Sequence, residues 1–215
     1  MRLAVDPGLA GRFPGLDAHL VEVGGLRVQE RDPRLDAFAE DLIREFRERL
    51  GLSTLKDEPA LRAYRDFYWR VGIDPTKIRP ASEALLRRIL QGKDFPRINV
   101  LVDAYNLASM KTRIAIAAFD ARQLRGDLTM RLAREGERFL GIGMAVPAVL
   151  RGVEVVVQDD ENLVAIYPYR DADATRVTTA TTDTVFMTCG VPGIERATLV
   201  DAAETTKGLV HRFCR

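Results

Sequence analysis

The chain has 215 residues, of which 47% are hydrophobic and 29% are charged, and its formal net charge is +1. This length and composition are typical of a globular protein with a sizeable core, built as one large domain or two small ones. A chain so close to neutral lacks the global basic field of a nonspecific nucleic-acid binder.

Cysteine and histidine are both scarce. Cys189 and Cys214 are too few for a disulfide framework and are interpreted as reduced thiols. His19 and His211 lie near opposite ends of the chain, so a four-ligand zinc site is not expected, and no cofactor is predicted.

No apolar run reaches the roughly 18 residues of a membrane helix. The first residues lack the apolar core of a signal peptide, so we expect a cytoplasmic location without membrane contact.

The first 60 residues combine turns with one strong helix. Glycines and prolines punctuate residues 1–30, and Leu20–Val23 with Leu26–Val28 are predicted to form a hairpin around Gly24-Gly25. Asp32-Pro33 is a typical helix start, and apolar residues then recur at helical spacing as far as residue 50. The apolar face of this helix is expected to pack on the core, with contact to a partner as the alternative.

The rest of the chain runs from helices to strands and back to a helix. Helices are predicted over residues 59–70, 80–92 and 100–110. Strands are predicted at residues 114–119, 130–133, 138–142, 153–157, 163–167 and 185–187, with a hairpin turn at 159–162, and a last helix at 197–213. This order indicates an α+β protein rather than βαβ alternation.

A polar cluster stands in the otherwise apolar stretch from residue 79 to residue 120. It consists of Asn99, Asp103, Asn106, Ser109 and Lys111. Buried polar groups cost free energy unless they are hydrogen-bonded, so they either tie the backbone together or bind a ligand. On a helix, Asp103 and Asn106 share a face with Asn99 one turn earlier, which suits a ribose, an amino group or a backbone loop. The predicted substrate-binding residues are Asn99, Asp103, Asn106, Ser109 and Glu83.

Positive charge is also concentrated here, because residues 79–113 carry a net charge of +4. Such a local basic patch suits phosphate contacts, although ordinary solvated helix charges explain it equally well. The predicted RNA-binding residues are Arg79, Arg87, Arg88 and Lys111. No P-loop, GxSxG or HExxH motif accompanies them.

Several ordered motifs resemble a known family. Ile98–Leu107 (INVLVDAYNL) is similar to N-x-V-V-D-x-T-N-Y, and Ala118-Phe119-Asp120 is similar to H-A-F-D. Ala133–Glu137 and Val177–Thr181 follow as A-x-x-G-E and V-T-x-x-T. Together they resemble the paired third and fourth domains of the phenylalanyl-tRNA synthetase beta subunit, which carry tRNA editing. Freestanding relatives of these domains share Arg79–Arg88 and Tyr64–Asp74, so the resemblance covers about Tyr64 to Phe213.

The resemblance implies an α+β fold with a β-sandwich-like core flanked by helices. It divides the chain into an N-terminal extension, residues 1–60, and an editing-like domain, residues 61–215, expected to form one compact unit. In the synthetase this domain hydrolyses tyrosine misattached to phenylalanine tRNA, using a pocket that positions water rather than a metal or a covalent nucleophile. Ala117 and Arg176 stand where that family has His and often Glu.

The leading hypothesis is binding of an aminoacyl-tRNA acceptor end and hydrolysis of mischarged aminoacyl-tRNA in trans. One alternative is a noncatalytic tRNA- or RNA-binding module, in keeping with the departures at Ala117 and Arg176. Another is the binding or turnover of a small amino-acid-like metabolite. The sequence does not indicate which amino acid or tRNA is recognised, or the oligomeric state.

Overall fold

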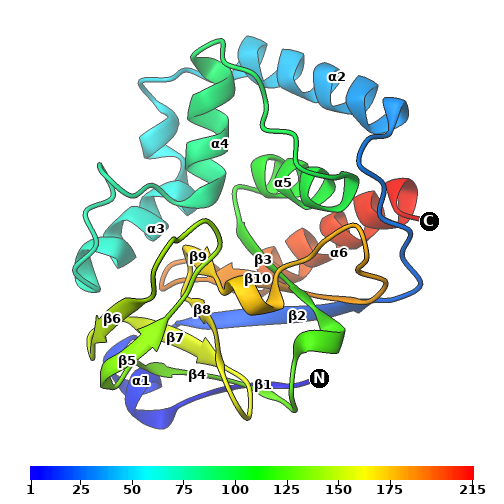
Figure 1. Cartoon of the computed structure of the whole chain (residues 1–215). Helices are drawn as coiled ribbons and strands as arrows, with labels where there is room; N and C mark the ends of the chain where they lie inside the picture. The colour runs from blue at the N-terminus through cyan, green and yellow to red at the C-terminus, as the bar shows by residue number, and fades with distance from the viewer.

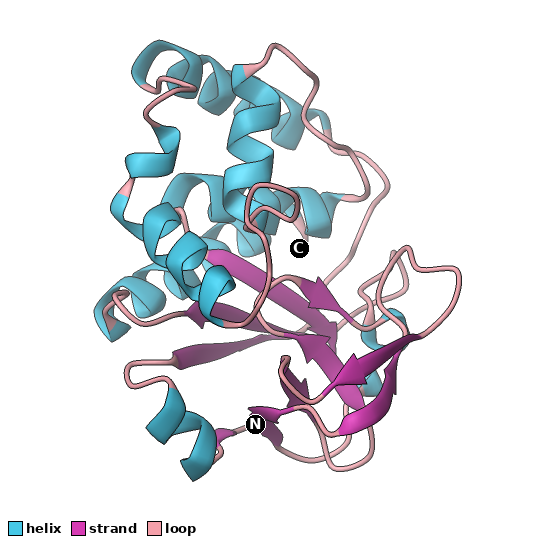
Figure 2. Cartoon of the chain, turned by 90° about the vertical axis from the view of Figure 1, so that its left-hand side faces the viewer, coloured by secondary structure: helices cyan, strands magenta, loops and turns pink.

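A computed structural model describes residues 1–215 and separates a helical side from a side made of strands, with only α1 among the strands (Figures 1 and 2). The helices are α1 (Pro7–Arg12), α2 (Pro33–Arg49), α3 (Pro59–Arg70), α4 (Ala81–Leu90), α5 (Val100–Thr112) and α6 (Arg196–Phe213). Short 3-10 helices lie at Leu55–Asp57, Ala121–Gln123 and Asp173–Thr175. The α+β class predicted from the sequence is confirmed.

Ten strands form three sheets. The strands are β1 (Leu3–Val5), β2 (Asp17–Val23), β3 (Ala115–Asp120), β4 (Leu128–Leu132), β5 (Glu135–Phe139), β6 (Ala148–Arg151), β7 (Val155–Gln158), β8 (Leu163–Ile166), β9 (Arg170–Asp171) and β10 (Thr184–Gly190). One antiparallel sheet has the order β2-β10-β3, the largest has the order β1-β4-β7-β8-β9, and β5 pairs with β6. Only the β1–β4 pair is parallel.

Strands β3 and β10 of the sheet β2-β10-β3 are buried on both faces, because the sheet lies between two hydrophobic cores. Side chains alternate along a strand, so Ile116, Ala118 and Phe186 face a core shared with α2, α4, α5 and α6. Ala117, Met187 and their neighbours face a second core shared with α3 and the five-stranded sheet. Burial on both faces explains why β3 is an unbroken apolar run without polar alternation.

The predicted helices are confirmed, and the amphipathic helix α2 packs on the core. Its buried residues are Leu35, Ala39, Leu42 and Phe46, and Asp32 caps it by accepting a hydrogen bond from the Arg34 amide at 2.8 Å. Helix α5 is buried on almost every side and lies beneath α2 and α4. The hairpin turn predicted at residues 159–162 is confirmed by the antiparallel pairing of β7 with β8.

The hairpin predicted around Gly24-Gly25 is wrong. β2 pairs along its whole length with β10, from Val23 opposite Thr184 to Asp17 opposite Gly190. Residues 26–28 are not a strand: the Leu26 and Arg27 amides donate to the carbonyls of Thr182 and Cys214. Long-range pairing with a buried strand therefore replaces the local hairpin that the glycines suggested. The division of the chain at residue 60 stays a prediction.

The Tyr64 hydroxyl joins α3 to the sheet β2-β10-β3, and its removal should destabilise the protein. It donates to the Cys189 carbonyl and accepts from the Ala115 amide at 3.0 Å, in a fully buried setting. Tyr64→Phe leaves both backbone groups unpaired, so we expect the free energy of unfolding in urea to fall by about 1–3 kcal/mol.

Tyr105→Phe is the matched control, because the Tyr105 hydroxyl has no protein partner and its ring keeps its contact with Phe186. We expect it to stay within about 0.5 kcal/mol of the parent chain. Equal destabilisation by the two substitutions would contradict the role assigned to the Tyr64 hydroxyl.

Candidate functional site

Five segments that are distant in the sequence meet around a cavity of about 390 Å³ beside the N-terminus of α5. The start of α5, strand β3 and the loop after the 3-10 helix Asp173–Thr175 are three of them, and Glu30 and Ile142 come from two others. The lining residues are Glu30, Ile98, Asn99, Val102, Tyr105, Ala118, Ile142, Arg176, Val177, Thr178 and Thr179. Slightly more than half of these residues are apolar, so the cavity suits a ligand with both apolar and polar parts.

One wall of the cavity is formed by the start of α5, where two side chains hold the backbone in place. Asn99 is the helix N-cap, and its Oδ1 accepts from the Val102 amide at 2.9 Å. Asp103 Oδ1 accepts from the Ile98 amide at 2.9 Å, so the two side chains together hold the first turn. Asn99 is 5% exposed, and its Nδ2 has no protein acceptor, which leaves that nitrogen free to donate to a ligand.

The opposite wall is a threonine-rich loop tied to the end of β3. Thr181 Oγ1 donates to Asp120 Oδ2 at 2.7 Å and accepts from the Thr178 amide at 2.9 Å. Asp120 and Thr181 belong to the two motifs A-F-D and V-T-x-x-T, so a hydrogen bond joins the motifs. This link places Val177, Thr178 and Thr179 against the cavity.

Tyr105 adds a hydroxyl to the cavity. Burial, reinforced by the carboxylates of Asp171 and Asp103, raises the pKa of Tyr105 well above its usual value. The side chain therefore stays a neutral hydroxyl at physiological pH and can both donate and accept.

Of the five predicted substrate-binding residues, Asn99 lines this cavity. Asp103 is almost fully buried and lies 3.6 Å from Arg97, and burial is the main cause of its raised pKa. Ser109 Oγ donates to the Ile114 carbonyl at 2.6 Å. These internal bonds favour the structural alternative for Asp103 and Ser109.

The other two predicted residues lie away from the cavity. Glu83 is completely buried and accepts from Arg65 at 3.0 and 3.2 Å, with Arg87 at 3.8 Å, so its carboxylate is neutralised inside the protein. Asn106 is half-buried, and its side chain has no hydrogen bond within the protein. A ligand contact by any of these four residues stays a prediction.

The two positions that differ from the family pattern lie in different surroundings. Ala117 packs in the core between the two larger sheets, on the face of β3 opposite Ala118. Arg176 lines the cavity, and its guanidinium is paired with Asp173 at 2.5 Å. The departure at Arg176 therefore changes the chemistry of the cavity wall directly.

Three of the four predicted RNA-binding residues line one groove of about 410 Å³ along α4. Arg79, Arg87 and Arg88 lie there with Lys77 and Lys93, and no carboxylate belongs to the lining. Lys111 lies elsewhere, beside Arg113 at the C-terminal end of α5. The groove is therefore locally positive, although the net charge of the whole chain is close to zero.

Sequence reasoning missed Glu30, Ile98 and Ile142 as cavity residues. Glu30 carries no local signal, because it reaches the cavity through long-range backbone pairing of its segment with the start of α5. Ile98 and Ile142 are apolar side chains that are 58% and 43% exposed, which only the structure reveals.

Asp171 was also missed, and it lies where the two larger sheets meet. At the end of β9, its Oδ2 accepts from the Ala118 amide of β3 at 3.3 Å. Its carbonyl accepts from Ile142, so it lies directly behind two cavity residues. Desolvation raises the pKa of Asp171 to about 7.

The fold and the cavity define an α+β domain with a ligand-sized, half-apolar site. A family model described as "B3/4 domain" matches residues 63–214, and the chain belongs to this family. The match confirms the resemblance predicted for residues 64–213.

No group of three or more His, Cys, Asp or Glu side chains is arranged to hold a metal ion. None of the helices combines the length and apolarity needed to cross a membrane.

One relative supports this assignment, and one solved structure shares the fold. The phenylalanine–tRNA ligase beta subunit of Nocardia farcinica (strain IFM 10152) is 31% identical over 159 residues, which is 74% of this chain but 17% of the ligase subunit. A crystal structure of an N-terminal fragment of the phenylalanyl-tRNA synthetase beta subunit from Pyrococcus horikoshii matches 99% of this chain and 48% of that fragment. With a TM-score of 0.53 and 14% identity, that match shows a shared fold.

The raised pKa of Asp171 predicts that its contribution to stability depends on pH. Because the folded state holds a proton on this carboxyl up to about pH 7, against an ordinary pKa of 3.8, stability falls as the pH rises between these values. Asp171→Asn keeps an acceptor for the Ala118 amide without the charge. We expect its melting temperature to exceed that of the parent chain at pH 8, and the difference to shrink at pH 5. An equal difference at both pH values would contradict this prediction.

Proposed function

We propose that this chain binds the acceptor end of an aminoacyl-tRNA and hydrolyses mischarged aminoacyl-tRNA in trans. The observation that supports this most is the convergence of three family-like segments, 98–105, 118 and 177–179, on one cavity. The relatives reported above are subunits of a phenylalanine-tRNA ligase, which is why an aminoacyl-tRNA is the proposed ligand. A cytoplasmic location fits this proposal.

The cavity offers the groups that ester hydrolysis by positioning requires. Asn99 Nδ2 and the Tyr105 hydroxyl are free to donate to an ester carbonyl or a ribose hydroxyl, while Val102 and Val177 line an apolar wall for the amino-acid side chain. General-base assistance contributes only about 10²–10⁴-fold, so a positioned water aided by the ribose hydroxyl of the tRNA is sufficient for an activated ester.

The basic groove on α4 is the proposed contact for tRNA phosphates. Arg79 and Lys93 have no ion-pair partner in the protein, so their charges are available to a polyanion. Arg87 and Lys77 already face carboxylates, those of Glu83 at 3.8 Å and Asp74 at 3.9 Å. In this proposal the groove supplies affinity and the cavity supplies chemistry.

Two other functions remain as outcomes of the test. A noncatalytic RNA-binding module would shift tRNA in a gel in a salt-dependent way and leave the ester intact. A protein acting on a small amino-acid-like metabolite would bind a free amino acid or its derivative without any dependence on tRNA.

The purified protein should deacylate at least one mischarged tRNA in a panel of mischarged and correctly charged tRNAs. Asn99→Asp keeps the N-cap acceptor but removes the amide donor, so the fold survives while the cavity loses a hydrogen-bond donor. We expect this variant to lose at least about tenfold in kcat/KM, as measured by release of radiolabelled amino acid, with an unchanged melting temperature.

Asn162→Asp is the matched control, because it makes the same chemical change at an exposed residue of the turn between β7 and β8, outside the cavity lining. It should retain the activity of the parent chain. Full activity in Asn99→Asp would show that the Asn99 amide does not contribute to deacylation. A panel without deacylation but with tRNA binding would favour the noncatalytic module.

The basic groove predicts salt-dependent tRNA affinity. Arg79→Gln should weaken tRNA binding and reduce the slope of log K against log salt concentration by about 1, since one phosphate contact is lost. Arg62→Gln, an exposed arginine on α3 outside this groove, should leave the slope unchanged. Equal slopes for all three proteins would show that tRNA does not use the groove.

A further inference from the structure

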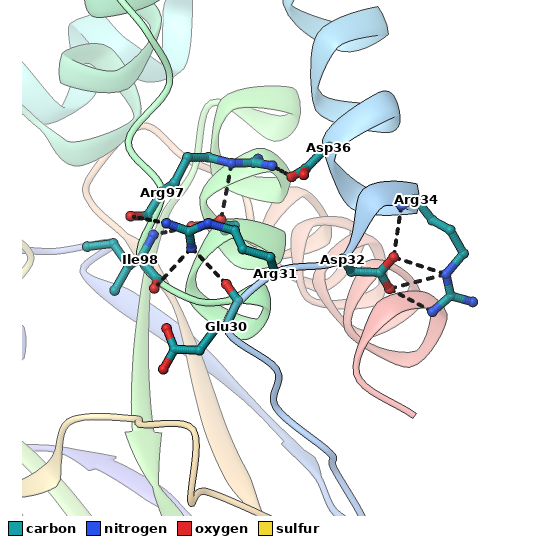
Figure 3. Close-up of polar contacts among 8 residues, drawn as sticks. Glu30, Arg31, Asp32, Arg34, Asp36, Arg97 and Ile98 are labelled. Atoms are coloured by element: carbon teal, nitrogen blue, oxygen red, sulfur yellow. Dashed lines mark hydrogen bonds and ion pairs between the residues drawn. The ribbon is translucent and has the colours of Figure 1, made fainter.

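The segment Gln29–Arg31 is held against the wall of the cavity by backbone and side-chain bonds. The Gln29 carbonyl accepts from the Val100 amide at 2.9 Å, at the first residue of α5. The Arg31 guanidinium donates to the carbonyls of Glu30 at 2.7 Å, Ile98 at 3.3 Å and Arg97 at 3.4 Å (Figure 3). Glu30 therefore has a fixed backbone position although it lies in an irregular stretch.

The carboxylates near Glu30 already have partners. Asp32 accepts from the Arg34 side chain at 2.7 Å, and Asp36 is paired with Arg97 (Figure 3). Asp103 accepts from Ile98 and also lies 3.6 Å from Arg97. Each of these acids is thus engaged in holding α2 and α5 in place.

The Glu30 carboxylate differs from them. It lines the cavity, has no hydrogen bond or ion pair within the protein, and points away from the guanidinium of Arg31 (Figure 3). Glu30 is the only carboxylate among the cavity residues, and Asn99 shares that lining with it. It also lies outside residues 63–214, which the family model matches.

We propose that Glu30 binds a protonated amino group of the ligand in this cavity. This inference rests on the proposed function, in which that group is the free α-ammonium of the aminoacyl ester. Glu30 is an exposed residue of the cavity lining, and its unpaired carboxylate is available for a charge-assisted hydrogen bond to an ammonium group in the cavity. Through Glu30 the N-terminal extension selects ligands with a free amine over those whose amine is acylated.

The test compares paired tRNA ligands whose α-amine is either free or N-acetylated. Both carry the amino acid through a noncleavable 3′-amide, so binding is measured without any hydrolysis. We expect the parent chain to prefer the free amine, and Glu30→Gln to lose about tenfold in affinity for it while binding the acetylated ligand unchanged. Glu48→Gln, an exposed and unpaired glutamate of α2, removes the same charge away from the cavity and should behave as the parent chain.

The outcomes separate this inference from the proposed function. Equal affinity of the parent chain for both ligands, or an equal loss for both ligands in Glu30→Gln, would overturn the role of Glu30. An equal loss in Glu48→Gln would assign the effect to general charge and overturn it as well. Preference for the free amine that depends on Glu30, in a protein that hydrolyses none of the esters in the panel, would support the amine site and reject the deacylase.

Discussion

The cavity depends on the hydrogen bonds that close the first turn of α5. Asn99 and Asp103 bind the amides of Val102 and Ile98, which fixes the chain direction just before the helix. The Val100 amide is then presented to the Gln29 carbonyl, and the carbonyls of Arg97 and Ile98 are presented to Arg31. A single helix start therefore organises one cavity wall and anchors the N-terminal segment to the rest of the protein.

This arrangement explains why polar residues are dense in an apolar stretch. Helix α5 is buried on most sides by other helices and by the sheet β2-β10-β3, so buried polar groups at its ends need partners within the protein. Asn99 caps the N-terminus, while Ser109 binds the Ile114 carbonyl where the chain leaves for β3. Within the predicted ligand-binding set, Asn99, Asp103 and Ser109 thus serve the two ends of a buried helix, and Asn99 is the member that lines the cavity.

Elements with strong local signals were predictable, and those that depend on distant partners were not. Helix α2 has an Asp-Pro start and regular apolar spacing, so local rules suffice. The sequence predicted only Val185–Met187 of β10, because Thr188 and Gly190 are residue types that are common in turns. In the structure both lie within the strand, and Thr188 Oγ1 donates to the His19 and Leu199 carbonyls. The two-residue strand β9 and the pairing of β2 with β10 leave no local pattern. The same limit hid Glu30, whose place beside Asn99 follows from tertiary contacts alone.

The distribution of charge reconciles a near-neutral chain with the tRNA ligand that we propose. The groove on α4 contains cations without carboxylates, whereas the cavity combines a carboxylate, a guanidinium, an amide and hydroxyls with apolar walls. A uniformly basic cavity would bind phosphate in preference to an amino acid, and a uniformly acidic one would repel the tRNA end. If the proposed function holds, affinity for the tRNA depends on the positive groove and selection of the attached amino acid depends on the mixed cavity, so the two are set independently. The carboxylate of the cavity lining, Glu30, lies outside the residues that the family model matches, so under the proposed function a change at Glu30 alters specificity without altering the family motifs.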